Sequence, residues 1–179
     1  MVSTSGHTLL SEDAIDTLRD SLLPWATIIT PNIPEAEILA NQERGSIKSL
    51  ENMKACAQEL GKLGPKYIYL KGGHMPLSRQ AKGHSSSAKK YIADVLYDTA
   101  TGTAEVFEKD AVDSKNTHGT GCTQSAALCA LLAKGNSVKE AVKMAGEYVR
   151  GAIAASYPLG TGAGPVHHLH TLVKRNLPA

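Results

Sequence analysis

The sequence contains a glycine-rich turn at the expected start of a helix, formed by Gly119, Thr120, Gly121 and Cys122. Glycines let a backbone approach a ligand closely, and the first amides of a helix point at anions with the macrodipole behind them. Such a turn can hold the charge that develops on a transferring phosphoryl group. From spacing alone, an ordinary glycine-rich helix start is an equally good interpretation.

Cys122 falls in the first turn of the same expected helix, where a thiol becomes a usable base or nucleophile. The alternative is a small buried hydrophobic side chain, which is what most free cysteines are. Cys56 and Cys129 fit that alternative, since each lies among apolar or small residues of an expected helix. Three cysteines without a CxxC spacing indicate neither a disulfide framework nor a cysteine zinc site.

Two further groups of candidate residues follow apolar runs that are typical of buried strands. Asn32 and Glu35 come after residues 26–30, and Lys71 follows residues 67–70. Ligands bind at the carboxyl ends of strands in open α/β sheets, so the first group could order Mg²⁺ beside a nucleotide and the lysine could contact a phosphate. The residues alone favour plainer interpretations, a first-turn helix carboxylate for Glu35 and a solvated turn for Lys71.

Composition excludes several classes of protein. The chain has 179 residues, 42% hydrophobic and 20% charged, which predicts one soluble globular domain. A net charge of +2, with no Lys/Arg run longer than two, gives no footprint for nucleic acid or an anionic membrane. We expect no signal peptide or membrane span, and therefore a cytoplasmic protein. His167, His168 and His170 fit no standard zinc spacing and indicate a surface or packing role.

Helix-like and strand-like segments alternate along the chain, which predicts an α/β fold with a mostly parallel sheet. We expect helices over 11–23, 35–40, 47–60, from the glycine turn to 133, and 137–155, strands over 26–30 and 67–70, and a hairpin of 91–98 with 103–107. Ser46 is expected to cap the third of these helices, and Ser137 with Glu140 to form a capping box. Pro24 is expected to end the first helix, and 75–90 to be a mobile loop.

Four stretches of the sequence together resemble the hydroxymethylpyrimidine/phosphomethylpyrimidine kinases of the ribokinase-like superfamily. They are TSGHTLLSEDAIDTLRDSLLPWATIITPNIPEAE, YLKGGH, KNTHGTGCTQSAALCALLAKG and GAGPVHHLH, and they cover nearly the whole chain in the family's order. The NTHGTGCT segment is specific, because most ribokinase relatives have an aspartate where this subgroup has the cysteine. The resemblance implies a Rossmann-like, mostly parallel sheet flanked by helices, with a small antiparallel hairpin.

The resemblance also implies roles for the residues of the glycine-rich turn. Cys122 matches the catalytic base that activates the substrate hydroxyl in this family. The backbone of Gly119, Thr120 and Gly121 matches the family's anion hole.

The strand-end residues match the family's nucleotide and metal site. Asn32 and Glu35 match an N-x-x-E motif that organises Mg²⁺ and its water shell, and Lys71 matches a contact to the nucleotide phosphates. The implied activity is ATP-dependent phosphorylation of 4-amino-5-hydroxymethyl-2-methylpyrimidine and then of its monophosphate, in thiamin biosynthesis. A pyridoxal-type kinase and a catalytically impaired ATP-binding or regulatory fragment are the alternatives.

The start of the chain departs from the family pattern. Family members carry a substantial segment before the position that matches Met1, with the first strands of the sheet and much of the substrate pocket. The resemblance therefore implies a single ribokinase-like kinase domain over residues 1–179 that lacks its N-terminal part. An uncovered sheet edge would favour pairing with another chain, so a homo-oligomer is one expectation.

Overall fold

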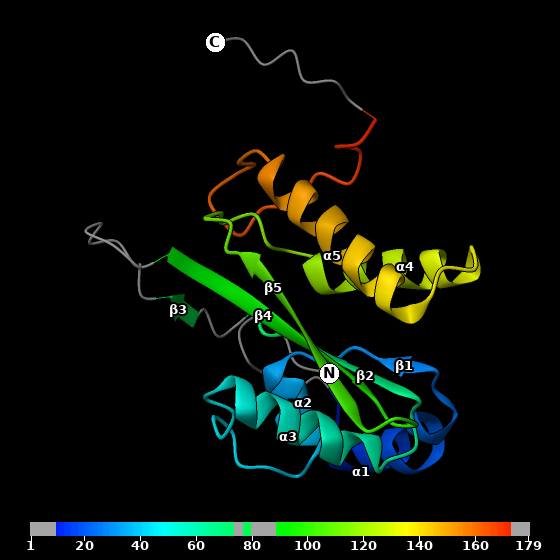
Figure 1. The fold of residues 1–179 in the computed structure, drawn as a ribbon. Helices are drawn as coiled ribbons and strands as arrows, with labels where there is room; N and C mark the ends of the chain where they lie inside the picture. Colours follow the sequence, from blue (N-terminus) through cyan, green and yellow to red (C-terminus); the bar gives the residue numbers. More distant parts are fainter. Residues whose placement is uncertain (1–9, 74–76, 80–88, 173–179) are drawn as a thin grey trace, which may run out of the picture. The chain divides into compact units, whose positions relative to one another are not determined.

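The computed structural model describes residues 10–73, 77–79 and 89–172, which fall into two compact units, Met1–Ala111 and Val112–Ala179 (Figure 1). The first unit contains α1 (Glu12–Thr17), a π-helical turn η1 (Leu18–Leu22), a 3-10 turn η2 (Leu23–Trp25), β1 (Ile28–Ile29), α2 (Ile33–Leu39), α3 (Leu50–Gly61), β2 (Tyr67–Leu70), β3 (Leu77–Arg79), β4 (Lys89–Asp98) and β5 (Thr103–Asp110). The second unit contains α4 (Thr120–Ala133) and α5 (Val138–Ala154). Among the described residues, no helix combines the length and the apolarity that crossing a membrane requires.

The first unit is built on a mixed sheet, which has five strands among the described residues, in the order β1-β2-β4-β3 with β5 on the other side of β4. Within that described sheet β1 and β2 are the one parallel pair, and the other three pairings are antiparallel. The expectation of a mostly parallel sheet is therefore met in this chain by β1–β2 alone. The physical reason is that β4 adds to β2 as an antiparallel neighbour and turns directly into β5, and neither pairing needs a crossover helix.

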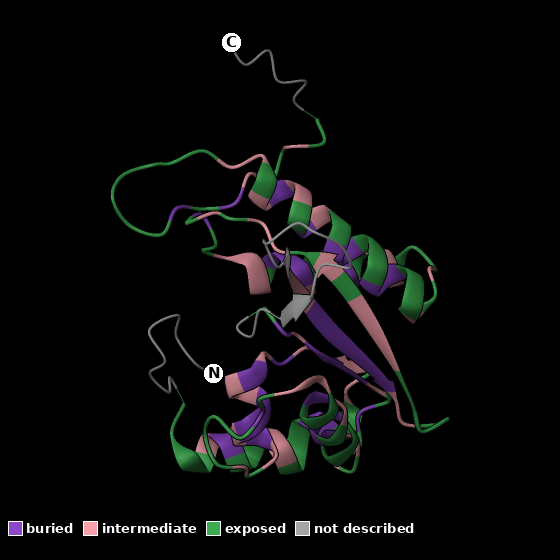
Figure 2. Ribbon diagram, turned by 60° about the vertical axis from the view of Figure 1, so that its left-hand side comes forward, coloured by how far each residue is buried: buried purple, intermediate pink, exposed green. Residues whose placement is uncertain are grey.

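The predicted hairpin is confirmed as β4 and β5, which pair from Tyr91↔Asp110 to Asp98↔Thr103. The Asp98 carboxylate accepts a hydrogen bond from the Ala100 amide at 2.9 Å and so shapes the turn. β4 is buried over residues 93–97, whereas β5 is half-buried to exposed (Figure 2). The loop expected over 75–90 is partly wrong, because Leu77–Arg79 form β3 and β4 begins at Lys89; the rest of that loop lies outside the described residues.

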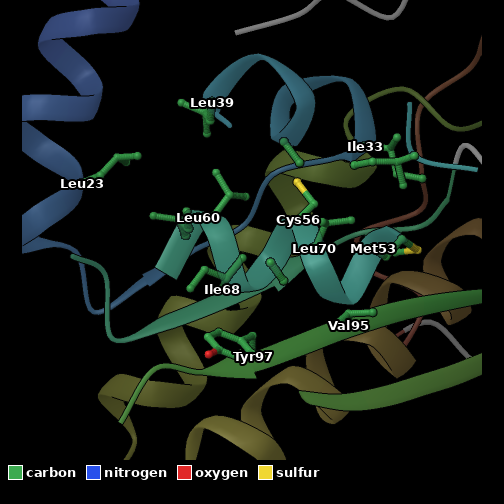
Figure 3. Packing of buried hydrophobic residues seen from close by; sticks show 14 residues of the cluster. Leu23, Ile33, Leu39, Met53, Cys56, Leu60, Ile68, Leu70, Val95 and Tyr97 are labelled. Atoms are coloured by element: carbon green, nitrogen blue, oxygen red, sulfur yellow. The ribbon is translucent and has the colours of Figure 1, made fainter. Parts of the chain in front are cut away.

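Helices α2 and α3 cover the sheet of the first unit and bury its apolar core (Figure 3). The buried cluster comprises Leu23, Ile29, Ile33, Ala36, Leu39, Ile47, Met53, Cys56, Ala57, Leu60, Ile68, Leu70, Val95 and Tyr97. The face of α3 that carries Met53, Cys56, Ala57 and Leu60 is the one that its apolar spacing predicts. Fully burying a Leu or Met side chain contributes ~1.5–3 kcal/mol, so this face holds α3 on the sheet.

The start of α3 differs from the expectation that Ser46 caps a helix from residue 47. Ser49 is the N-cap, and its hydroxyl accepts from the Asn52 amide at 3.1 Å. The reason lies in Glu37, a carboxylate only 2% exposed, which accepts from the amides of Gly45 at 3.0 Å and Ile47 at 2.9 Å. These two hydrogen bonds hold residues 45–47 as a loop, so the helix cannot begin until after residue 47.

The first helix is also shorter than expected. α1 ends at Thr17, and the chain then continues as the π-helical turn η1 and the 3-10 turn η2 as far as Trp25. Pro24 lies inside the 3-10 turn and does not end a helix at the residue before it. Proline is compatible with the first positions of a helical turn, because its missing amide has no partner there. β1, at Ile28–Ile29, is likewise shorter than the strand expected over 26–30.

The second unit is a pair of helices with a returning tail. α5 begins with the predicted capping box, in which the Ser137 hydroxyl accepts from the Glu140 amide at 3.3 Å and the Glu140 carboxylate accepts from the Ser137 amide at 3.1 Å. After α5 the tail returns to the segment before α4, where the His118 amide donates to the Gly164 carbonyl at 3.2 Å. The tail therefore lies next to the glycine-rich turn in this unit.

Candidate functional site

The parallel strands of the first unit bring two candidate residues side by side. The β1–β2 register continues beyond both strands as a bridge between Asn32 and Lys71, and the Lys71 amide donates to the Pro31 carbonyl at 2.9 Å. Both residues therefore lie at the carboxyl ends of neighbouring parallel strands, which is where open α/β sheets bind ligands. The sequence predicts this position for both of them, and the structure confirms the position.

Asn32 and Glu35 form a reciprocal cap at the start of α2. Asn32 Oδ1 accepts from the Glu35 amide at 2.9 Å, and Glu35 Oε2 accepts from the Asn32 amide at 3.0 Å. The plainer interpretation of Glu35, a first-turn helix carboxylate, is therefore correct as a description of its structural role. The same two bonds fix the direction of both side chains at the end of β1.

The residues alone favoured a solvated turn for Lys71. In the structure Lys71 is half-buried, so that interpretation is wrong. Its ammonium donates to the carbonyl of Thr30, the last residue before the β1-to-α2 turn. This bond draws the positive charge of Lys71 toward the strand end that carries Asn32. The arrangement places one ammonium and one carboxylate around the ends of β1 and β2.

A small hollow lies beside this strand end within the first unit. Its volume is about 220 Å³, and it is lined by Leu18, Leu23, Ile29, Thr30, Pro31, Glu35 and Leu39. Ligand pockets that enclose a drug-sized molecule usually have ~300–1,000 Å³, so this hollow is too small to hold a nucleotide on its own. It can accept part of a ligand whose charged groups contact the strand ends.

In the second unit, the glycine-rich turn has the geometry of an anion site. Gly119 is the N-cap of α4 with φ 81°, a left-handed conformation that favours glycine, and no side chain of the described residues caps the helix. Among the described residues, none accepts a hydrogen bond from the backbone amides of Gly121 or Cys122, whereas the Thr120 amide donates to Thr117. Open amides at the N-terminus of a 14-residue helix are suited to binding an anion.

Cys122 is exposed beside these amides and lines an apolar groove of about 640 Å³ between α4 and α5. The groove is lined by Cys122, Thr123, Ala126, Ala127, Ala130, Leu131, Lys134, Met144, Tyr148 and His168. Cys56 is buried as predicted, but Cys129 is exposed, and the expectation of a buried Cys129 is wrong. The reason is that apolar and small residues are spread around α4 without forming one apolar face, so its composition does not mark which side is buried.

Sequence reasoning missed the residues that hold the glycine-rich turn. Thr123 Oγ1 donates its single proton to the Gly119 carbonyl at 2.7 Å, so it must accept at its 3.0 Å contact with His168 Nε2. His168 therefore carries a proton on Nε2, an assignment made from the hydrogen-bond geometry. From the sequence, His168 was expected to have a surface or packing role, and its contact with Thr123 becomes visible only once the tail returns to His118.

The other histidines of the tail make aromatic contacts. The His170 ring lies 5.0 Å from that of Tyr148, and the His167 ring contacts Tyr157 edge-on at 6.1 Å. In the part of the chain that the structure describes, no group of three or more His, Cys, Asp or Glu side chains could hold a metal ion. The packing role predicted for these histidines is confirmed for His167 and His170.

Asp94 was also missed, although it has a sequence signal. It is an acidic residue inside the apolar strand β4, and it is only 1% exposed. A buried carboxylate needs hydrogen-bond donors, so such a residue indicates a polar network within the sheet.

Comparisons with known proteins agree with these features. Residues 1–167 match the family model described as phosphomethylpyrimidine kinase. The hydroxymethylpyrimidine/phosphomethylpyrimidine kinase of Bacillus subtilis is 36% identical over 176 residues, which are 98% of this chain and 58% of that protein. This chain therefore spans a little over half the length of that relative.

Two solved structures show the same fold. The ADP complex of Bacillus subtilis pyridoxal kinase matches with a TM-score of 0.77 and 37% identity, covering 92% of this chain and 58% of that one. The phosphomethylpyrimidine kinase of Clostridium difficile matches with a TM-score of 0.64 and 33% identity, covering 86% and 54%. The ribokinase-like α/β fold is thereby confirmed, and the chain belongs to the phosphomethylpyrimidine kinase family.

Proposed function

We propose that this chain carries the nucleotide-binding and phosphoryl-transfer residues of a kinase that uses ATP to phosphorylate 4-amino-5-hydroxymethyl-2-methylpyrimidine and then its monophosphate. The observation that carries the proposal is the uncapped start of α4, where the amides of Gly121 and Cys122 have no acceptor among the described residues. The family match and the ADP complex of a related kinase support ATP as the phosphoryl donor.

In this mechanism the glycine-rich turn and Cys122 act on the transferring group. Cys122 accepts the proton of the substrate hydroxyl as the hydroxyl oxygen bonds to the γ-phosphorus and the bond to the β–γ bridging oxygen breaks, releasing ADP. The open amides of the turn hold the charge that develops on the phosphoryl oxygens. The Thr123 bond to the Gly119 carbonyl keeps the turn in place for this task.

The strand-end residues of the first unit would bind the phosphates and the metal. Lys71 supplies a point charge, while Glu35 and Asn32 present a carboxylate and an amide at the end of β1. This donor set fits Mg²⁺, which is usually held by one or two carboxylates together with waters and substrate phosphates rather than by an all-protein cage. When bound, the ion neutralises phosphate charge; Glu35 would hold its water shell, supported by Asn32.

A pyridoxal-type ring is the second candidate substrate. The observation that favours it is the 0.77 TM-score and 37% identity to a pyridoxal kinase. Pyridoxal and the aminopyrimidine both present a hydroxymethyl group on a small heteroaromatic ring, so the same transfer chemistry serves either. The phosphate-binding residues do not distinguish the two rings, so the preferred ring is identified by comparing the turnover of each.

The test is a coupled ADP-release assay of the purified chain with each ring in parallel and with ATP hydrolysis subtracted. We expect turnover with the aminopyrimidine that exceeds turnover with pyridoxal. Preference for pyridoxal would replace the first substrate by the second. ATP binding without turnover of either ring would support the third alternative, a catalytically impaired nucleotide-binding fragment.

A further inference from the structure

A buried carboxylate in the first unit joins the Lys71 turn to the sheet. Asp94 lies in β4 with its side chain 2% exposed, and it receives donors from three different segments. Its Oδ1 accepts from the Gly72 amide at 2.9 Å. Its Oδ2 accepts from the Tyr69 hydroxyl and from the Lys109 ammonium, both at 2.5 Å.

The two oxygens of Asp94 have separate partners and therefore separate effects. Oδ2 links β4 to the neighbouring strands β2 and β5, through Tyr69 and Lys109. Oδ1 links β4 to the turn that follows β2 and carries Lys71. Buried ion pairs add little stability compared with apolar side chains of similar volume, so the stability of the sheet alone does not explain this carboxylate.

Gly72 adds a second constraint on the same turn. A Cβ at this position would lie 1.9 Å from the Ala93 carbonyl oxygen and 3.1 Å from Met53 Cε, a residue of the buried cluster shown in Figure 3. The turn therefore rests directly on β4 at the residue before Asp94. Glycine allows this approach, and the Asp94 carboxylate holds the turn there.

The position of Lys71 depends on this attachment. The amide of Lys71 donates a hydrogen bond to the Pro31 carbonyl, and the amide of the next residue, Gly72, donates one to the Asp94 carboxylate. With both flanking points fixed, the side chain leaves the strand end in one direction, toward the Thr30 carbonyl. Freeing the Gly72 amide would let the turn move and would remove the fixed starting point of the ammonium.

We propose that Asp94 is a positioning residue for phosphate binding, which acts through the Gly72 amide to hold Lys71 at the carboxyl end of β2. The proposal rests on the proposed function, since it assigns Asp94 to the same nucleotide site. Asp94 itself lies one strand away and contacts the turn rather than the phosphates. Asp94 contributes by fixing the position of the Lys71 ammonium before the phosphates bind, so that binding does not have to order this charge.

The experiment uses Lys109→Met as a background, because removing the ammonium lets position 94 be changed without leaving a charge unpaired in the sheet. In that background Asp94→Asn keeps an acceptor for Gly72, and its amide group can donate to the Tyr69 hydroxyl. Asp94→Leu has a similar volume and no acceptor. The two double variants therefore differ in whether the Gly72 amide and the Tyr69 hydroxyl have a partner at position 94, and hydrogen exchange at Gly72 reports the first of these differences separately.

We expect the asparagine variant to bind Mg·ATP with a Kd within about threefold of the unmodified chain, and the leucine variant to bind about tenfold more weakly, as for loss of one anchoring hydrogen bond. Binding is measured by calorimetry, and denaturant unfolding confirms that each variant is folded. Equal Kd values in the two double variants would overturn the proposal, because the Gly72 bond would then have no effect on the site.

Amide hydrogen exchange at Gly72 supplies a readout that does not need ATP. We expect slow exchange in the unmodified chain and in the asparagine variant, and fast exchange in the leucine variant if it folds. Fast exchange in the unmodified chain would refute the anchoring of the turn. Absence of ATP binding by the unmodified chain would refute the proposed function instead, while slow Gly72 exchange in the asparagine variant and fast exchange in the leucine variant would still show that the side chain at position 94 holds the turn.

Discussion

Two glycines with the same backbone conformation flank α4 and permit a matched test of anion binding. Gly119 precedes the helix with φ 81°, and Gly135 follows it with φ 87°. Within the described part of the chain, a Cβ added at either position meets no atom within 4 Å. Substitution by alanine therefore introduces backbone strain at both sites and steric conflict at neither.

The expected magnitudes follow from this geometry. An L residue in the left-handed region costs ~1–2 kcal/mol, and replacing glycine by alanine returns ~0.4–1 kcal/mol through the unfolded chain. Gly119→Ala and Gly135→Ala should each lower the free energy of unfolding by about 0–1.6 kcal/mol, with a central value of ~0.8 kcal/mol. Only Gly119→Ala disturbs the turn with the open amides, and losing one charge-assisted bond raises the Kd for ATP about tenfold or more.

The assay combines urea unfolding with calorimetric titration of Mg·ATP for the unmodified chain and both variants. Similar stability losses with weaker binding in Gly119→Ala alone would agree with phosphate binding at this end of α4. Two outcomes would refute the reasoning: equal loss of ATP affinity in both variants, or unchanged affinity in Gly119→Ala despite the expected loss of stability.

The remaining predictions concern single side chains. Cys122→Ala should lower the rate of transfer ~10²–10⁴-fold as for loss of a general base, with ATP affinity nearly unchanged; turnover at the parent rate would remove the base assignment. Glu35→Gln should raise the Mg²⁺ concentration needed for half-maximal ATP binding, and an identical Mg²⁺ titration would count against its metal role. Burial, with the nearby Glu37 and Glu59 charges, raises the pKa of Cys56 to about 12 from 9.0. At pH 8 a thiol reagent should therefore label exposed Cys122 and Cys129 quickly and Cys56 only on unfolding. The contribution of Cys56 to the free energy of unfolding should be present below pH 9 and lost as the pH rises toward 12.

Local signals predicted the elements whose ends depend on neighbouring residues. The Ser137 and Glu140 box starts α5 as expected, and the apolar spacing of α3 identifies its buried face. The hairpin follows from its alternating strands and the turn at Gly102. Each of these features is decided within a few residues of chain, so the sequence contains the necessary information.

Features decided by distant contacts could not be predicted in the same way. Ser46 and Ser49 are equally good helix caps in sequence, and Glu37 excludes the first by bonding the amides of Gly45 and Ile47. The donors to Asp94 come from β2, the following turn and β5, so its role appears only once the sheet is formed. For the candidate site, the residue types and the strand-end position were predictable, whereas the ties that hold them were not.

The most direct test of the central claim is a backbone amide NMR titration of the chain with Mg·ATP. We expect the amide signals of Gly121 and Cys122, which have no acceptor among the described residues, to shift on nucleotide addition, and inorganic phosphate to shift them in the same direction. Binding of ATP that leaves these two amides unmoved would contradict the assignment of the α4 N-terminus as the phosphoryl-binding site.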